Sequence, residues 1–157
     1  MKIKGKKIEN VNKREVLIPR TNPEDNLTFT VCAVLDYDAF EKMIPMPQPK
    51  KKMVPGGGFI FDMEDQGYKA AITQRDAKRS SWLILKSLDG TEGLEWETVD
   101  MSNPDTWNNY ASELKSANLT TYEINKIIRA ILEVNGLTED KVEAAKDSFL
   151  PQASPAA

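Results

Sequence analysis

The stretch of residues 70–88, AAITQRDAKRSSWLILKSL, constrains the fold of this chain more than any other. Large side chains recur along it at steps of three and four, so they share one face of a helix: Ile72, Arg75, Arg79, Trp82 and Leu85. Burying Trp82, the largest apolar residue on this face, should stabilise the fold by about 2–3 kcal/mol relative to exposure. We therefore predict a central core helix, in which Arg75 and Arg79 extend their charged ends to solvent or pair with acidic residues rather than bind a ligand.

The sequence before this helix has strand patterns. The strongest is in residues 27–35, LTFTVCAVL, where one face is fully apolar: Leu27, Phe29, Val31, Ala33 and Leu35. Residues 14–20, REVLIPR, predict a second short strand, and Pro19 places its end at a sheet edge. The intervening residues 21–26, TNPEDN, have the composition of a turn. Together these segments predict a small antiparallel sheet.

A short helix is predicted next, capped by Asp36, with Phe40 and Met43 on one face and with Pro45 at its end. Residues 45–58, PMPQPKKKMVPGGG, are expected to be an irregular, solvated loop. No Gly-Lys-Ser/Thr follows the glycines, which argues against a phosphate-binding loop. Residues 59–61 could add an edge strand, and the acids before residue 66 suit a helix N-terminus better than a cation site.

After the central helix we expect an acidic turn and then, at residues 94–99, a short strand or extended strap in which Trp96 is the main apolar residue. A second helix within residues 100–117 has Asn103 as its cap, Pro104 in its first turn, and an apolar stripe: Trp107, Tyr110 and Leu114.

A third helix begins with a capping box formed by Thr120 and Glu123 and ends at Asn135 and Gly136. Its apolar face is the clearest in the chain: Ile124, Ile127, Ile128, Ile131 and Leu132. A fourth helix is predicted at residues 139–149, and residues 151–157 are expected to be a disordered tail.

These patterns predict an α+β protein with a β-rich part (residues 1–62), a helical part of about four helices (residues 63–150) and a short tail. A chain of 157 residues suits one domain, or a core domain with a helical appendix. No stretch approaches the roughly 20 apolar residues of a membrane span. The basic N-terminus lacks the apolar region of a signal peptide, so we expect an intracellular protein.

Composition restricts the chemistry. The chain has one cysteine, Cys32, and no histidine, which excludes an intramolecular disulfide, zinc sites of the Cys/His type and histidine-based triads. Its formal charge of −3 argues against a dedicated nucleic-acid-binding protein. Its 24 acidic residues include clusters, yet none is marked as a catalytic pair. We expect no enzyme activity, no metal and no cofactor.

Two segments resemble a known family. Residues 127–150, IIRAILEVNGLTEDKVEAAKDSFL, resemble the C-terminal part of tail assembly chaperones of long-tailed bacteriophages. Residues 79–94, RSSWLILKSLDGTEGL, are similar to the helix of that family that precedes an acidic loop. The resemblance implies a non-enzymatic protein in the cytoplasm of the infected bacterial host. Such a protein binds the tape measure protein, keeps its apolar helices from aggregating and assists recruitment of tail tube subunits.

A chaperone of this kind needs apolar grooves between helices. The candidate partner-binding residues are Trp82, Leu85, Trp107, Tyr110, Ile124, Ile128 and Ile131. The alternative is that these side chains simply pack on one another, and homo-oligomerisation through the same faces is a further alternative.

Two other functions compete with the chaperone. One is a structural virion protein, a tail tube or head–tail joining subunit, whose loop at residues 45–58 orders against a neighbour. The weaker is a regulator that binds nucleic acid through lysines near the N-terminus and in the loop: Lys2, Lys4, Lys6, Lys7, Lys50, Lys51 and Lys52.

Overall fold

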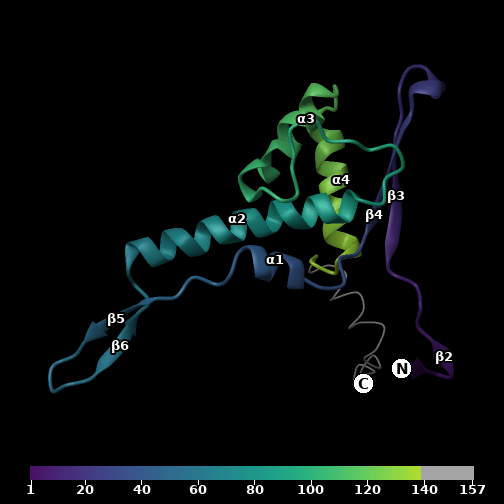
Figure 1. The fold of residues 1–157 in the computed structure, drawn as a ribbon. Coiled ribbons are helices and arrows are strands. Elements are labelled where there is room, and N and C mark those ends of the chain that lie inside the picture. The colour runs from purple at the N-terminus through teal and green to yellow at the C-terminus, as the bar shows by residue number, and fades with distance from the viewer. Residues whose placement is uncertain (139–157) are drawn as a thin grey trace, which may run out of the picture.

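A computed structural model describes residues 1–138 and confirms the α+β class (Figure 1). The strands are β1 (Lys2–Ile3), β2 (Lys6–Lys7), β3 (Lys13–Ile18), β4 (Leu27–Cys32), β5 (Lys50–Met53) and β6 (Phe59–Asp62). The helices are α1 (Asp38–Met43), α2 (Gln66–Leu88), α3 (Tyr110–Ser116) and α4 (Thr121–Val134), with short 3-10 helices η1 (Pro23–Asp25) and η2 (Pro104–Asn109). The predicted helix at residues 139–149 and the tail lie outside the described residues.

The strands form three separate antiparallel pairs, β1–β2, β3–β4 and β5–β6, rather than one sheet. In the main pair, Val16 lies opposite Phe29 and Ile18 opposite Leu27. The strand predicted at residues 27–35 ends early, at Cys32. Leu35 is 78% exposed, so the prediction that Leu35 belongs to the apolar face was wrong. One more backbone hydrogen bond follows the ladder, from the Ala33 amide to the Asn12 carbonyl, and the amide of Val34 donates to the side chain of Asn135 at the end of α4.

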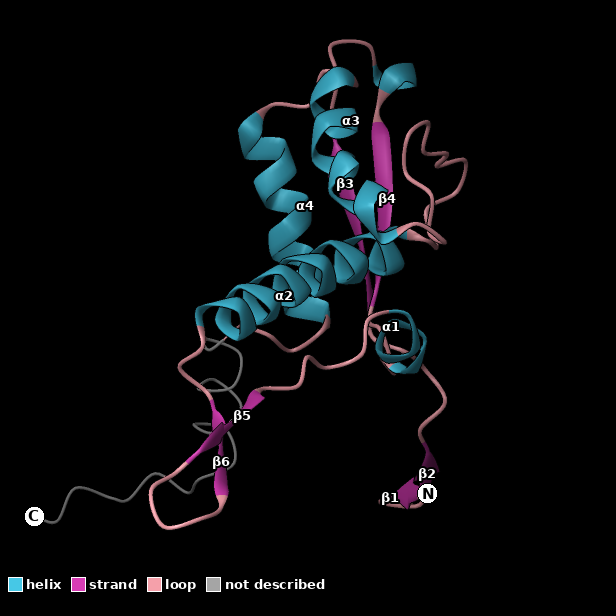
Figure 2. Cartoon of the chain, turned by 60° about the vertical axis from the view of Figure 1, so that its left-hand side comes forward, coloured by secondary structure: helices cyan, strands magenta, loops and turns pink. Residues whose placement is uncertain are grey.

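The β3–β4 pair and the helices share one core. Alternate residues of both strands are buried against α2 and α4, as a strand with one solvated face requires: Val16, Ile18, Phe29 and Val31 from the strands, with Leu83, Ile84, Leu88, Ile127 and Ile131 from the helices. Figure 2 shows α4 and β3–β4 on the C-terminal half of α2.

The central helix begins at residue 66, four residues before the predicted stretch, because the Asp65 side chain accepts from the amide of Tyr68. Its N-terminal half is mostly exposed, whereas Trp82 and its neighbours up to Leu88 are buried on nearly all sides. Trp82 and Leu85 pack with Phe40 and Trp107, while Leu83, Ile84 and Leu88 face the other core cluster. The C-terminal half of α2 therefore separates two apolar clusters.

The predicted helix ends are largely confirmed. Asn103 accepts from the amide of Asp105 at the start of η2, and Thr120 and Glu123 form the capping box of α4. Gly136 follows α4 with a φ of 68°, the left-handed conformation typical of a helix end. The second predicted helix is split into η2 and α3, and residues 94–99 form an irregular strap, bent at residues 97–98, rather than a strand. The predicted cap of α1 was wrong: the helix starts at Asp38 with Tyr37 as its N-cap and without a side-chain cap, while Asp36 lies one residue earlier and accepts from the Asp38 amide.

The prediction of an irregular loop at residues 45–58 was wrong in its second half. Residues 50–53 pair with residues 59–62 as a hairpin, which projects beyond the N-terminal end of α2 (Figure 2). The turn is made by Gly56, Gly57 and Gly58, all at positive φ. Lysine is a poor strand former, but pairing with the apolar strand FIFD across this turn overrides the local preference.

Candidate protein-interaction surfaces

The predicted partner-binding residues lie in the core. Trp82, Leu85 and Trp107 surround Phe40, and Ile124 and Ile131 belong to the other cluster; all five are no more than 8% exposed. Tyr110 and Ile128 are partly buried against the same clusters. The alternative that these side chains pack on one another therefore describes the structure, and a role in partner binding stays a prediction.

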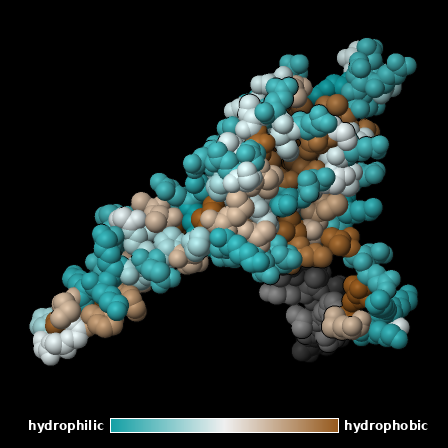
Figure 3. Space-filling view, viewed as in Figure 1, coloured by the Kyte–Doolittle hydropathy of each residue, from teal (hydrophilic) through white to brown (hydrophobic). Residues whose placement is uncertain are grey.

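A different apolar surface is exposed on the β5–β6 hairpin, residues 50–62, which we call the arm. Five large apolar residues at the arm and its base are half exposed or more: Met53 (74%), Phe59, Ile60, Phe61 and Met63. The rings of Phe59 and Phe61 contact each other edge to face, with centroids 5.9 Å apart. Figure 3 shows these apolar residues at the end of a narrow projection rather than against the body.

The arm is also basic. Lys50, Lys51 and Lys52 are all exposed, and the Lys51 ammonium lies 4.3 Å from the centroid of the Phe59 ring. Lys50 lies 3.7 Å from a carboxylate oxygen of Asp65, while Lys51 and Lys52 form no salt bridge within residues 1–138. Figures 1 and 2 place the N-terminal lysines of β1–β2 well apart from the arm, so the two groups of lysines do not form one basic face.

A second surface is a cleft of about 450 Å³ between β4, the strap at residues 94–99 and α3. Its walls are mainly apolar: Leu27, Phe29, Leu94, Trp96, Leu114 and Leu119. Three carboxylates line it as well, from Glu95, Glu97 and Glu113. Glu95 and Glu97 are exposed and form no salt bridge in the described part of the chain. The cleft therefore combines an apolar floor with a negative rim.

Glu113 holds the strap in place. Its carboxylate accepts from the Glu97 amide (2.9 Å), the Thr98 amide (2.7 Å) and the Thr98 hydroxyl (2.6 Å). Burial raises the pKa of this carboxyl, but these hydrogen bonds, with one from the Val99 amide, together outweigh burial and leave the pKa below its usual value of 4.5. The ionised form is thus part of the folded structure.

Replacing Glu113 by glutamine should lower the free energy of unfolding at pH 7 by about 1–2 kcal/mol, because an amide accepts fewer and weaker hydrogen bonds. The folded pKa is lowered, so this stabilisation is fully present above pH 4.5 and is lost as the pH falls through the folded value. Urea unfolding of both proteins at several pH values checks this. A difference that stays constant down to pH 3 would contradict it.

Arg75 confirms the predicted pairing of an arginine with an acidic residue. Its side chain is 3% exposed, and its guanidinium pairs with Glu41 of α1 and donates to the Ile44 carbonyl at 3.1 Å. Arg79 lies instead over the Tyr37 ring, 4.7 Å from its centroid. Both arginines attach α2 to the segment around α1.

Comparisons of the chain with protein-family models, with curated proteins and with solved structures found no match. Within residues 1–138, metal-ligating side chains do not gather in groups of three or more, and none of the helices described there has the length and apolarity to cross a membrane. Sequence reasoning missed the arm and the cleft. The available signals were the apolar run FIF close to three lysines, and the alternation in LEWETV.

Proposed function

We propose that this protein is a non-enzymatic tail assembly chaperone that acts in the cytoplasm of an infected bacterium and holds the tape measure protein through its arm. The observation that carries the proposal is the apolar surface of the arm, exposed on a hairpin that packs on neither core cluster. Exposed apolar patches of this kind mark interaction sites in soluble proteins. The resemblance of residues 79–94 and 127–150 to the chaperone family also supports this proposal.

The arm suits a long helical client. Apolar side chains contact the apolar stripe of an amphipathic helix, and the neighbouring lysines contact acidic residues that flank such a stripe. Each arm offers only a few residues, so a single contact is weak. Many chaperone copies along one long client bind strongly in sum and cover its apolar face. Recruitment of tail tube subunits would follow once the client is covered.

Co-expression with the tape measure protein encoded beside this chain tests the proposal. We expect a soluble complex on size-exclusion chromatography with the unchanged chain, and loss of the complex, with an insoluble client, for the double variant Phe59→Ser and Phe61→Ser. The matched control is Tyr122→Ser, which removes an aromatic residue of the body that is 88% exposed. Equal client solubility with all three chains, or none with any, would overturn the proposal.

The alternative proposal is a structural virion subunit of the tail tube or the head–tail joint. It is favoured by the two hairpins, β1–β2 and β5–β6, that both project from the body (Figure 2). Projecting hairpins let neighbouring subunits overlap in a closed lattice. Tubes or rings formed by this chain alone, and its presence at high copy number in the mature tail, would favour this alternative over the chaperone.

A further inference from the structure

Within residues 1–138, the arm and the cleft have complementary character. The arm is apolar and positive, with Lys51 and Lys52 unpaired within the described chain. The cleft is apolar and negative, with Glu95 and Glu97 exposed on its rim. We propose that the arm of one copy docks into the cleft of a second copy, so that copies of this chain associate head to tail.

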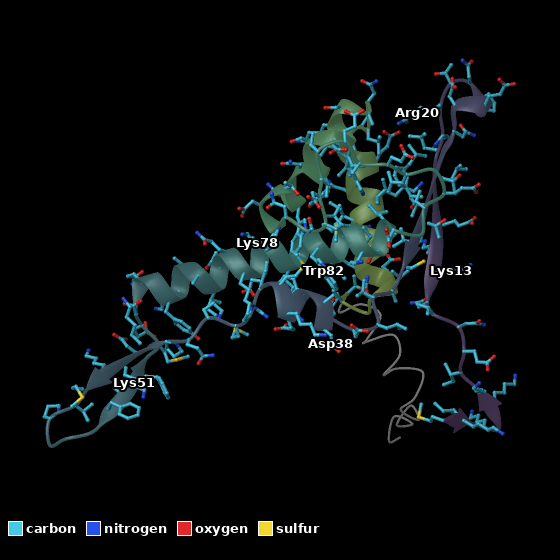
Figure 4. The ribbon with its side chains drawn as sticks, viewed as in Figure 1. Lys13, Arg20, Asp38, Lys51, Lys78 and Trp82 are labelled. Carbon is cyan, nitrogen blue, oxygen red and sulfur yellow. The ribbon has the colours of Figure 1, made fainter. Side chains whose placement is uncertain are left out.

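One chain cannot make this contact with itself. The arm precedes the first residue of α2, whereas the strap follows its last residue. A helix of 23 residues is roughly 35 Å long, at about 1.5 Å per residue. Figure 4 shows Lys51 at one end of this helix, well away from Trp82, and Figure 1 shows the strap leaving the other end. The cleft is therefore open only to the arm of another molecule.

The chemistry of the two surfaces matches in detail. Because alternate residues of a strand share a face, Phe59 and Phe61 lie on one face of the arm, and Met53 is opposite Phe59. This aromatic face suits the cleft floor, which is formed by Phe29, Leu94 and Trp96. The cleft has a volume of about 450 Å³, which admits side chains of this size. Lys51, which is opposite Phe61 in the ladder, shares this aromatic face and then meets the rim glutamates, a pairing that fixes orientation and excludes other partners. Lys52 is opposite Ile60 on the other face of the arm, where it adds to the positive charge of the arm.

The contact is heterologous, since it joins two different patches. Such contacts produce a ring if the rotation closes and an open chain if it does not. In either assembly, every arm except a terminal one is covered. If the protein is a chaperone as proposed, self-association would also keep the apolar arm covered until a client competes for it. This role of the contact rests on the proposed function.

Analytical ultracentrifugation of the full chain without any client tests the contact. At concentrations up to about 0.5 mM we expect oligomers that weaken with added salt, because the rim contacts are exposed charges. Reversing the charge of the arm (Lys51→Glu with Lys52→Glu) or the charge of the rim (Glu95→Lys with Glu97→Lys) should weaken association at least about tenfold, because like charges then repel. The matched controls, Lys6→Glu with Lys7→Glu on β2 and Glu24→Lys with Asp25→Lys in η1, should associate as the unchanged chain does.

The deciding measurement is a mixture of the two reversed proteins. Each arm then meets a cleft of opposite charge only on the other variant, so an equimolar mixture should regain oligomers that neither variant forms alone. A mixture that stays monomeric, or an unchanged chain that is monomeric throughout, would overturn the inference. Client solubility in co-expression is a separate measurement, so the chaperone proposal and this contact can fail independently.

Discussion

Replacing Trp107 by alanine should lower the free energy of unfolding by about 3–5 kcal/mol, the cost typical of removing a fully buried large aromatic side chain. Trp107 is 0% exposed, and the 3-10 helix η2 places it against Phe40, with ring centroids 6.2 Å apart. Phe40 in turn contacts Trp82 on α2 at 5.7 Å. The indole therefore joins η2, α1 and α2, and the cavity left by alanine lies where none of these elements can easily close it.

Urea unfolding followed by circular dichroism measures this loss, because tryptophan emission itself changes in the variant. Trp107→Phe is the matched control: the indole nitrogen is buried without a hydrogen-bond partner, so phenylalanine removes an unsatisfied donor and keeps most of the ring contacts. We expect it to cost less than half as much as alanine. A cost below about 1 kcal/mol for alanine would show that η2 contributes little to the core.

The helices were the most predictable part of this fold because their signals are local. The capping box of Thr120 and Glu123 and the cap of Asn103 before Pro104 involve residues three positions apart or fewer, and each forms as expected. The apolar spacing of α2 predicted a buried face, but not the burial of Leu83 and Ile84 on its other side. That burial depends on where β3–β4 and α4 pack, which the spacing within one helix does not specify.

The interaction surfaces were the least predictable part, because they depend on pairings between distant residues. The strand Lys50–Met53 depends on its ladder with Phe59–Asp62. The cleft depends on Glu113 of α3, which holds the strap, and on Thr91, which bonds to Thr30 of β4. Residues at helical spacing such as Trp82 and Ile131 were candidates for binding, yet the same spacing buries them in the core. A docking surface differs from a core in its exposure to solvent and not in its hydrophobicity. The sequence alone reports hydrophobicity but not exposure.

Replacing Glu41 by alanine should lower the free energy of unfolding by about 2–3 kcal/mol. This loss is smaller than the usual cost of breaking a buried pair, because Glu41 is 48% exposed. The cost arises at Arg75, whose guanidinium stays buried and, among residues 1–138, keeps only the Ile44 carbonyl and the Phe40 ring as partners. Arg75→Met should cost less, since an apolar side chain needs no counter-charge there and Glu41 is free to meet water. Urea unfolding of the two variants measures this asymmetry, and an arginine replacement more costly than the glutamate replacement would show that packing, rather than charge, fixes α1 on α2.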